Sequence, residues 1–168
     1  KTASAVNLAH LSALSGTRTL LGDLDPQGAA SFYFRVKPRV KGGGGKLVRG
    51  DTDPDARIKA TDFQGLDLLP ADFSYRHMDL DLQQTRKPTT RIRRLLRPLA
   101  REYELLVIDC APSISLVSES VFRAADVLLV PTIPTPLSLR TLLQLLKSLR
   151  KARSKRVGVF PFFCMVDR

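Results

Sequence analysis

The sequence predicts an α/β fold, a doubly wound and mostly parallel sheet with helices on both faces. Short apolar runs typical of strands alternate with longer segments of helical periodicity along the chain. This order favours βαβ units, whose right-handed crossovers set successive strands parallel to one another. The run LLVIDCAP is apolar until an acid ends it, which is typical of a strand buried on both faces of a parallel sheet.

The first half of the chain contains one expected helix and two expected strands. Apolar side chains recur at helical spacing over residues 3–15, and Gly16 follows as a residue suited to end a helix. The apolar stripe consists of Val6, Ala9, Ala13 and Leu14. The runs TRTLLGDLD and GLDLLPA are expected to be short strands.

The second half continues the alternation. The run TTRIRRLLRPLARE has helical periodicity, although Pro98 interrupts its second part. Further helices are expected over 115–125 and over about 137–152, and strands over DVLLVP and VGVFPFFCMV. The expected buried stripe of the last helix consists of Leu139, Leu142, Leu143, Leu146 and Leu149.

Residues 35–62 lack periodicity and carry most of the glycines, so we expect an irregular, basic insertion within a single domain over 1–168. Its run KGGGGKL resembles a phosphate-binding loop, but Leu47 stands where such a loop needs a hydroxyl for Mg²⁺. Pro38 and basic residues precede it instead of a buried strand. We therefore interpret Gly42–Gly45 as a flexible surface loop that binds no nucleotide.

Composition restricts the class of protein. Two cysteines, Cys110 and Cys164, lie in apolar runs without metal-ligand spacing, which favours buried, reduced thiols in a cytoplasmic protein. No apolar run reaches the roughly 18–20 residues of a membrane span, and no secretory signal pattern is present. The net charge of +11 suggests a polyanionic partner. The chain opens on a helix without an upstream strand, so we expect it to be a piece of a longer polypeptide.

Acids end two of the expected strands. Asp23 and Asp25 follow TLLG, and Asp109 follows LLVI. Any one of them could simply cap a turn. Together with the opening Lys1 and Thr2 they supply the lysine, hydroxyl and acid that a P-loop nucleoside triphosphatase needs for phosphates and Mg²⁺, if residues before Lys1 provide the glycines.

At these residues the sequence resembles the ParA/MinD-type deviant Walker-A ATPases, and most closely the ParA partition ATPases. The matching stretches are KTASAVNLAHLSALSGTRTLLGDLDPQGAAS, GLDLLPAD, YELLVIDCAPSISLVSESVFRAADVLLVPTIPTPLSLRTL and MVDR. The pairing of DLDPQG with VIDCAPS is specific, whereas KT alone is weak.

The resemblance implies a role for each of these residues with ATP and Mg²⁺ as cofactors. Lys1 and Thr2 end the Walker A motif, and Thr2 and Asp109, the Walker B acid, hold the metal. Asp25 positions the attacking water and Pro112 belongs to the second switch. Asp23 supports the site without touching the metal.

The sequence departs from the family pattern at two places. The glycine loop and the signature lysine that reaches the partner subunit's site precede Lys1 and are not in this chain. Ala29 and Ala30 follow DPQG, where the family usually has an asparagine.

Basic residues accumulate between Val127 and Val166, a stretch without acids. They are Arg140, Lys147, Arg150, Lys151, Arg153, Lys155 and Arg156, the candidate DNA-binding cluster. A second basic stripe consists of Arg91, Arg94, Arg97 and Arg101. Two stripes without interleaved acids favour contact with a phosphate backbone, and few aromatic residues accompany them for base stacking. A phosphate-rich membrane surface is the competing partner.

The function implied by the resemblance is an ATP-hydrolysing switch in plasmid or chromosome partition or related cargo positioning. It would dimerise around ATP, bind DNA without sequence preference on the nucleoid in the cytoplasm, and respond to a ParB-like centromere-binding activator. The alternatives are a catalytically inactive ParA-like regulator or DNA-binding module and a MinD-like membrane-associated ATPase. The amphipathic C-terminal helix expected of the last does not occur in this chain.

Overall fold

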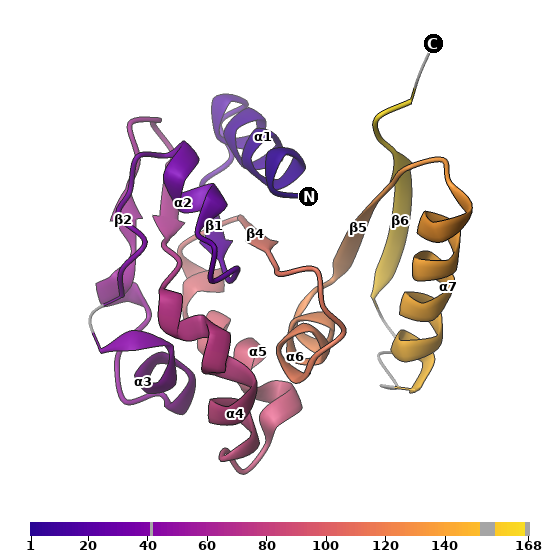
Figure 1. The fold of residues 1–168 in the computed structure, drawn as a ribbon. Helices are drawn as coiled ribbons and strands as arrows, with labels where there is room; N and C mark the ends of the chain where they lie inside the picture. Colours follow the sequence, from indigo (N-terminus) through magenta and orange to yellow (C-terminus); the bar gives the residue numbers. More distant parts are fainter. Residues whose placement is uncertain (41, 152–156, 167–168) are drawn as a thin grey trace.

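The computed structural model describes residues 1–40, 42–151 and 157–166. Its larger sheet has the strand order β2-β3-β1-β4, in which β3, β1 and β4 are parallel and β2 pairs antiparallel at the edge (Figure 1). The strands are β1 (Thr19–Asp23), β2 (Lys59–Ala60), β3 (Leu66–Leu69) and β4 (Leu105–Asp109). The predicted α/β class with a mostly parallel sheet is confirmed.

A separate pair of strands follows in the chain. β5 (Val127–Thr132) and β6 (Gly158–Phe163) are parallel to each other and are connected through α7 (Pro136–Lys151). Within the described residues they form their own two-stranded sheet and are not hydrogen-bonded to β4, which differs from the single continuous sheet expected. Figure 1 shows this unit beside the main body, with a gap between the ribbons of β4 and β5.

Helices cover both faces of the main sheet, and the strand side chains alternate between them. Leu21 and Val107 pack against α1 (Thr2–Leu14), whereas Leu20 and Ile108 pack into clusters on the opposite face. This alternation follows from the period of two along a strand. The expected helix over 3–15 is confirmed. Gly16 follows its end at φ 90°, but Leu14 is exposed rather than buried.

The remaining helical elements lie between the strands. They are α2 (Ala29–Tyr33), α3 (Gly43–Arg49), η1 (Asp55–Arg57), η2 (Phe73–His77), α4 (Met78–Gln83), η3 (Pro88–Thr90), α5 (Arg91–Leu96), η4 (Leu99–Arg101) and α6 (Leu116–Ala124), where η marks a 3₁₀ helix. The helix expected in TTRIRRLLRPLARE ends before Pro98, because proline has no N–H for the next helical turn.

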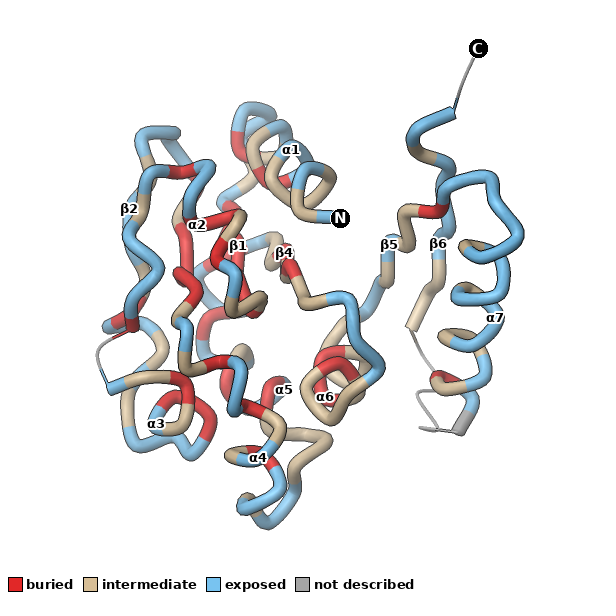
Figure 2. The backbone as a smooth tube through the Cα atoms, viewed as in Figure 1, coloured by how far each residue is buried: buried red, intermediate tan, exposed pale blue. Residues whose placement is uncertain are grey.

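The expectation of an irregular, flexible segment at residues 35–62 is wrong for its central part. Helix α3 begins within the glycine run, and Leu47 and Val48 are fully buried in the core that α3 shares with α4 and α5 (Figure 2). Gly44 is buried and its N–H donates to Ser74 Oγ at 2.7 Å. These glycines are therefore a packed helix start, in which the N–H groups of Gly43 and Gly44 donate to Val40 O and Ser74 Oγ.

The expected buried stripe of α7 is partly wrong. Leu139 is 55% exposed and Leu143 is 50% exposed, whereas Leu149 is buried. The side of α7 that faces β5 contributes Thr141 and Leu142 to a hollow beside the strand. None of the helices in the described residues is long and apolar enough to cross a membrane.

Candidate functional site

Two acids meet at the carboxyl edge of the main sheet. Asp23 ends β1 and Asp109 ends β4, and the two residues are register partners on neighbouring parallel strands. Both are almost fully buried, at 0% and 3% exposure. Leu24 N donates to Asp109 O at 2.9 Å, so the chain leaving β1 is tied to β4 beyond the last ladder pair. Ligands of parallel α/β sheets bind at this edge.

The carboxylate of Asp23 is occupied by hydrogen bonds. Its Oδ2 accepts from both the N–H and the hydroxyl of Ser31 at 2.8 Å, and its Oδ1 accepts from Asp25 N at 3.3 Å. Burial raises the pKa of Asp23 and the neighbouring charge of Asp109 adds to this, while the bonds from Ser31 and Asp25 oppose it. Asp23 thus joins β1 to α2 and to the turn that follows the strand.

Asp109 differs because its Oδ2 is buried and accepts no hydrogen bond from any described residue. A buried carboxylate oxygen without a partner costs free energy unless a cation or water satisfies it. The described residues contain no group of three or more His, Cys, Asp or Glu side chains that could hold a metal by themselves. A single carboxylate such as that of Asp109 suits Mg²⁺, which is commonly held by one or two carboxylates together with phosphates and water.

Asp25 lies in a tight turn directly after β1. Its Oδ1 accepts from Gln27 N at 2.9 Å, and its carbonyl accepts from Gly28 N at 2.9 Å. Gly28 has φ 66°, and a Cβ there would lie 2.9 Å from Pro38 Cβ, so both the backbone and the space require glycine. The turn fixes the backbone of Asp25 and leaves the side chain half-buried beside Asp23.

Lys1 and Thr2 lie at the start of α1, which packs over β1 and β4. The charge of Lys1 acts on Cys110, the residue after Asp109. Burial and the charge of Asp109 raise the pKa of the Cys110 thiol to about 12, Lys1 opposes the rise, and Asp25 adds to it. At neutral pH this thiol is therefore protonated. Cys110 and Cys164 are free and half-buried, which is less burial than the sequence predicted.

The loop between β4 and α6 contains Pro112, which is exposed. The loop ends in a reciprocal cap in which Ser118 N donates to Ser115 Oγ and Ser115 N donates to Ser118 Oγ. From α4, Asp79 Oδ1 also accepts from Val117 N at 2.8 Å, so two elements hold the start of α6. Sequence reasoning missed Asp79, which stands in none of the matching stretches, and gave no role to Ser31, which ends the first of them.

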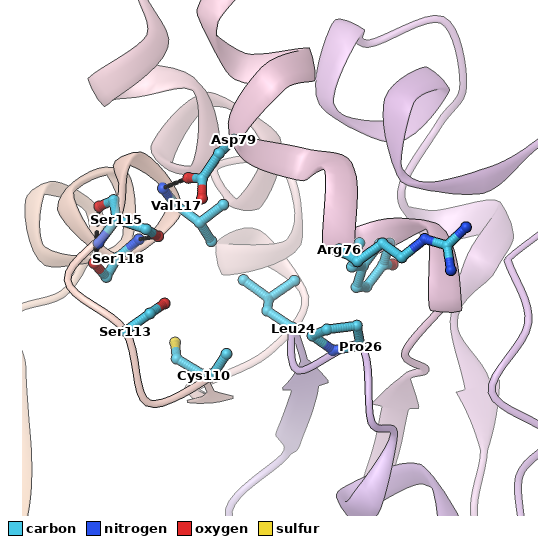
Figure 3. A pocket seen from close by; sticks show the side chains of 11 residues that line it. Leu24, Pro26, Arg76, Asp79, Cys110, Ser113, Ser115, Val117 and Ser118 are labelled. Carbon is cyan, nitrogen blue, oxygen red and sulfur yellow. Dashed lines mark hydrogen bonds between the residues drawn. The ribbon is translucent and has the colours of Figure 1, made fainter.

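A pocket of about 150 Å³ lies between the turn after β1 and the loop after β4. Figure 3 shows Cys110 and Ser113 on one side and Leu24 and Pro26 on the other, with Asp79 bonded to Val117 above them. The full lining is Leu24, Pro26, Tyr75, Arg76, Asp79, Cys110, Ala111, Ser113, Ser115, Val117 and Ser118. The pocket therefore adjoins the residues that directly follow Asp25 and Asp109.

The candidate DNA-binding residues are only partly within the described structure. Arg140, Lys147 and Arg150 lie exposed on α7, and Lys151 is its last residue. Arg153, Lys155 and Arg156 lie outside the described residues.

The parallel sheet and the acids at its carboxyl edge fit a P-loop-type nucleoside triphosphatase fold. A family model described as "AAA domain" matches residues 1–158, and the chain belongs to this family. Within it the chain is similar to the ParA-like P-loop ATPases, as the motifs predicted.

Two curated relatives are named for inhibition of sporulation initiation and for chromosome partitioning. The chain is 32% identical over 151 residues to the sporulation initiation inhibitor protein Soj of Bacillus subtilis, covering 89% of this chain and 60% of Soj. It is 34% identical over 132 residues to the chromosome partitioning protein ParA of Myxococcus xanthus, covering 78% of this chain and 47% of that protein. The chain thus spans about half to 60% of these relatives.

Solved structures share the fold. Cobyrinic acid a,c-diamide synthase from Mycobacterium smegmatis, solved with ADP and magnesium, superposes with a TM-score of 0.87 at 24% identity over 99% of this chain and 69% of that one. A McdA–ATP complex from Cyanothece superposes with a TM-score of 0.86 at 21% identity over 96% of this chain and 64% of that one.

Proposed function

We propose that the intact protein is a Mg²⁺-dependent ATPase of the ParA type that acts in plasmid or chromosome partition or in related cargo positioning. The observation that carries the proposal is the buried, unpartnered Oδ2 of Asp109 beside Asp23, next to Cys110, whose pKa is influenced by the charges of Lys1 and Asp25. A carboxylate oxygen in this position can accept a cation. Family membership makes Mg²⁺ together with ATP the matching ligand.

Each residue of the site has a role that follows from its chemistry. Lys1 offers a positive charge to the β- and γ-phosphates, and the first N–H groups of α1 and its dipole favour the same anions. Thr2 and Asp109 supply a hydroxyl and a carboxylate to the metal shell. Bound Mg·ATP supplies the phosphoryl group that is transferred and the metal charge that offsets negative charge as the bond breaks.

Asp25 is assigned to orienting the attacking water, because the turn fixes its backbone while its side chain stays half-buried. Asp23 stabilises that turn because its carboxylate accepts hydrogen bonds from Asp25 N and Ser31 N. Pro112 belongs to the loop after Asp109, whose conformation would respond to the nucleotide.

The partition role rests on the relatives. The resemblance to ParA partition ATPases implies that the whole protein forms a homodimer in the ATP state, binds DNA without sequence preference, and responds to a ParB-like activator in the nucleoid region of the cytoplasm. The net charge of +11 supports a polyanionic partner.

Matched lysine substitutions test the nucleotide site in the full-length protein. Lys1→Ala should weaken ATP binding by about tenfold or more, since a phosphate contact of about 1.4 kcal/mol or more is lost. Lys46→Ala, which removes the exposed lysine after the glycine run, should leave the affinity unchanged. Equal losses in the two variants would reject the assignment of Lys1. Tight ATP binding without any turnover would support the inactive-regulator alternative.

A further inference from the structure

A second cationic surface lies on the segment around α5. Residues 82–101 contain no acid and seven basic residues. Six of these are exposed, and none of the six takes part in a salt bridge within the described structure. They are Arg86, Lys87, Arg93, Arg94, Arg97 and Arg101, which we call the α5 cationic surface.

The seventh basic residue, Arg91, serves a different purpose. Its Nε donates to the carbonyl of Val48, and its guanidinium lies against Gly50 at the end of α3. Arg91 therefore holds α5 to α3 and is not available to a partner, which removes it from the basic stripe that the sequence suggested. The exposed arginines have no such role in the described structure, so their charge is presented to solvent.

The apolar residues of the same segment are buried. Ile92 is 0% exposed, Leu99 is 1% exposed and Leu95 is 8% exposed. A surface that inserts into a lipid headgroup layer needs exposed apolar side chains among its cations, and this surface has no such apolar face. Residues 78–102 also contain no aromatic residue on which an unpaired base could stack. The α5 cationic surface thus has dense positive charge but neither an exposed apolar face nor aromatic residues.

We propose that the α5 cationic surface contacts the phosphate backbone of double-stranded DNA, separately from the basic cluster on α7. Guanidinium groups suit phosphate oxygens through paired, charge-assisted hydrogen bonds, and backbone contact requires no reading of bases. The two surfaces belong to different parts of the molecule, since α5 packs on α6 and α3 whereas α7 packs on β5 (Figure 1). This inference rests on the proposed function, because it takes the intact protein to bind DNA.

The test is a salt titration of duplex affinity with the full-length, ATP-bound protein. The α5 variant carries Arg93→Gln, Arg94→Gln and Arg97→Gln. The charge-matched control carries Lys37→Gln, Lys46→Gln and Lys59→Gln, three exposed lysines outside the α5 cationic surface. Unchanged ATP affinity and circular dichroism in both variants would establish that they are folded.

Because each neutralised phosphate contributes roughly −0.9 to the slope of log affinity against log salt, the α5 variant should lose about one to three units of slope. At low salt it should bind duplexes of unrelated sequence about tenfold or more weakly, while the control keeps a slope within about half a unit of the wild-type value. If the α5 variant has the same slope of log affinity against log salt as the control, the inference is overturned.

Three further outcomes separate the possible failures. If Arg140→Gln, Lys147→Gln and Arg150→Gln together abolish binding while the α5 variant binds like the control, the inference fails and the proposed function stands. If the wild-type protein binds no duplex, the DNA-binding part of the proposed function fails together with the inference. If the α5 variant loses binding only to vesicles of anionic lipid or only to single-stranded RNA, the surface belongs to that partner and the duplex assignment is overturned.

Discussion

Asp23 and Asp109 are register partners at the ends of neighbouring parallel strands. Both carboxylate oxygens of Asp23 accept hydrogen bonds, whereas Oδ2 of Asp109 accepts none from the described residues. The strand register brings two acids together in a buried place, which is unfavourable unless the charges are compensated. Asp23 is compensated by Ser31 and by the backbone of the following turn. Asp109 has a buried oxygen without a partner among the described residues, so the two acids differ in their contacts, and the proposed function assigns the free oxygen to Mg²⁺.

This assignment predicts opposite phenotypes for Asp109 and Asp25. Asp109→Asn should lower Mg²⁺-dependent ATP affinity by about tenfold or more, because a neutral amide is a poorer magnesium ligand. Asp25→Ala should keep the affinity within a factor of about three and lower turnover by roughly a hundredfold or more, which would accumulate the ATP-bound form. Calorimetric binding with and without Mg²⁺ and phosphate-release assays on the full-length protein measure both. Hydrolysis by Asp25→Ala at the wild-type rate would contradict the role given to Asp25.

The raised pKa of Asp23 predicts a pH dependence of folding. The folded state holds the Asp23 proton more tightly than the unfolded state, so the free energy of unfolding contributed by this group falls as pH rises from the ordinary value of 3.8 through the folded pKa. Asp23→Asn removes this loss, so its stability relative to the wild type should rise over that window. Urea unfolding of both proteins without nucleotide, from about pH 3 to about pH 7, measures the difference in their free energies of unfolding at each pH.

Asp72 provides a control of opposite sign. Burial opposes ionisation of Asp72, but hydrogen bonds from Ser74 and Val40 outweigh it and lower its pKa below 3.8. The stability that Asp72 contributes is therefore present above pH 3.8 and is lost as pH falls through its folded pKa. Asp72→Asn should lose stability relative to the wild type as pH rises. The same sign for both variants would contradict the direction assigned to the pKa of Asp23.

The elements predicted correctly are those that local sequence determines. Helix α1 and strands β1, β3 and β4 follow from the period of their apolar residues and from the turn residues that end them. Asp23, Asp25 and Asp109 could be found because an acid at the end of an apolar strand is visible in the sequence. The hydrogen bonds that distinguish Asp23 from Asp109 could not be predicted, since they depend on Ser31, eight residues from Asp23.

The errors come from packing between distant segments. Three glycines disfavour a helix, yet α3 forms because Leu47 and Val48 enter the core and Gly44 fits against Tyr75, where a Cβ would lie 2.5 Å from a ring carbon. Tertiary contacts outweigh local propensity there. On α7 the leucines occupy more than one face, and the position of β5 decides which face is covered, so Leu139 could not be assigned from periodicity alone.

Asp79 and Val117 are 38 residues apart and predict a test of how the loop after β4 is held. Asp79→Ala removes a carboxylate from the N-terminus of α6, which should lower the free energy of unfolding by about 1 kcal/mol, the usual cost of losing a helix cap. Since α6 directly follows the loop that contains Pro112, ATP turnover should also fall while nucleotide affinity changes by less than about threefold. The matched control is Asp81→Ala on the same helix, which loses a partly exposed ion pair with Arg49 and should cost roughly 0.2–1 kcal/mol without affecting turnover. Urea unfolding and steady-state hydrolysis by the two variants measure the difference, and equal turnover in both would show that the Asp79 contact stabilises α6 without positioning the loop.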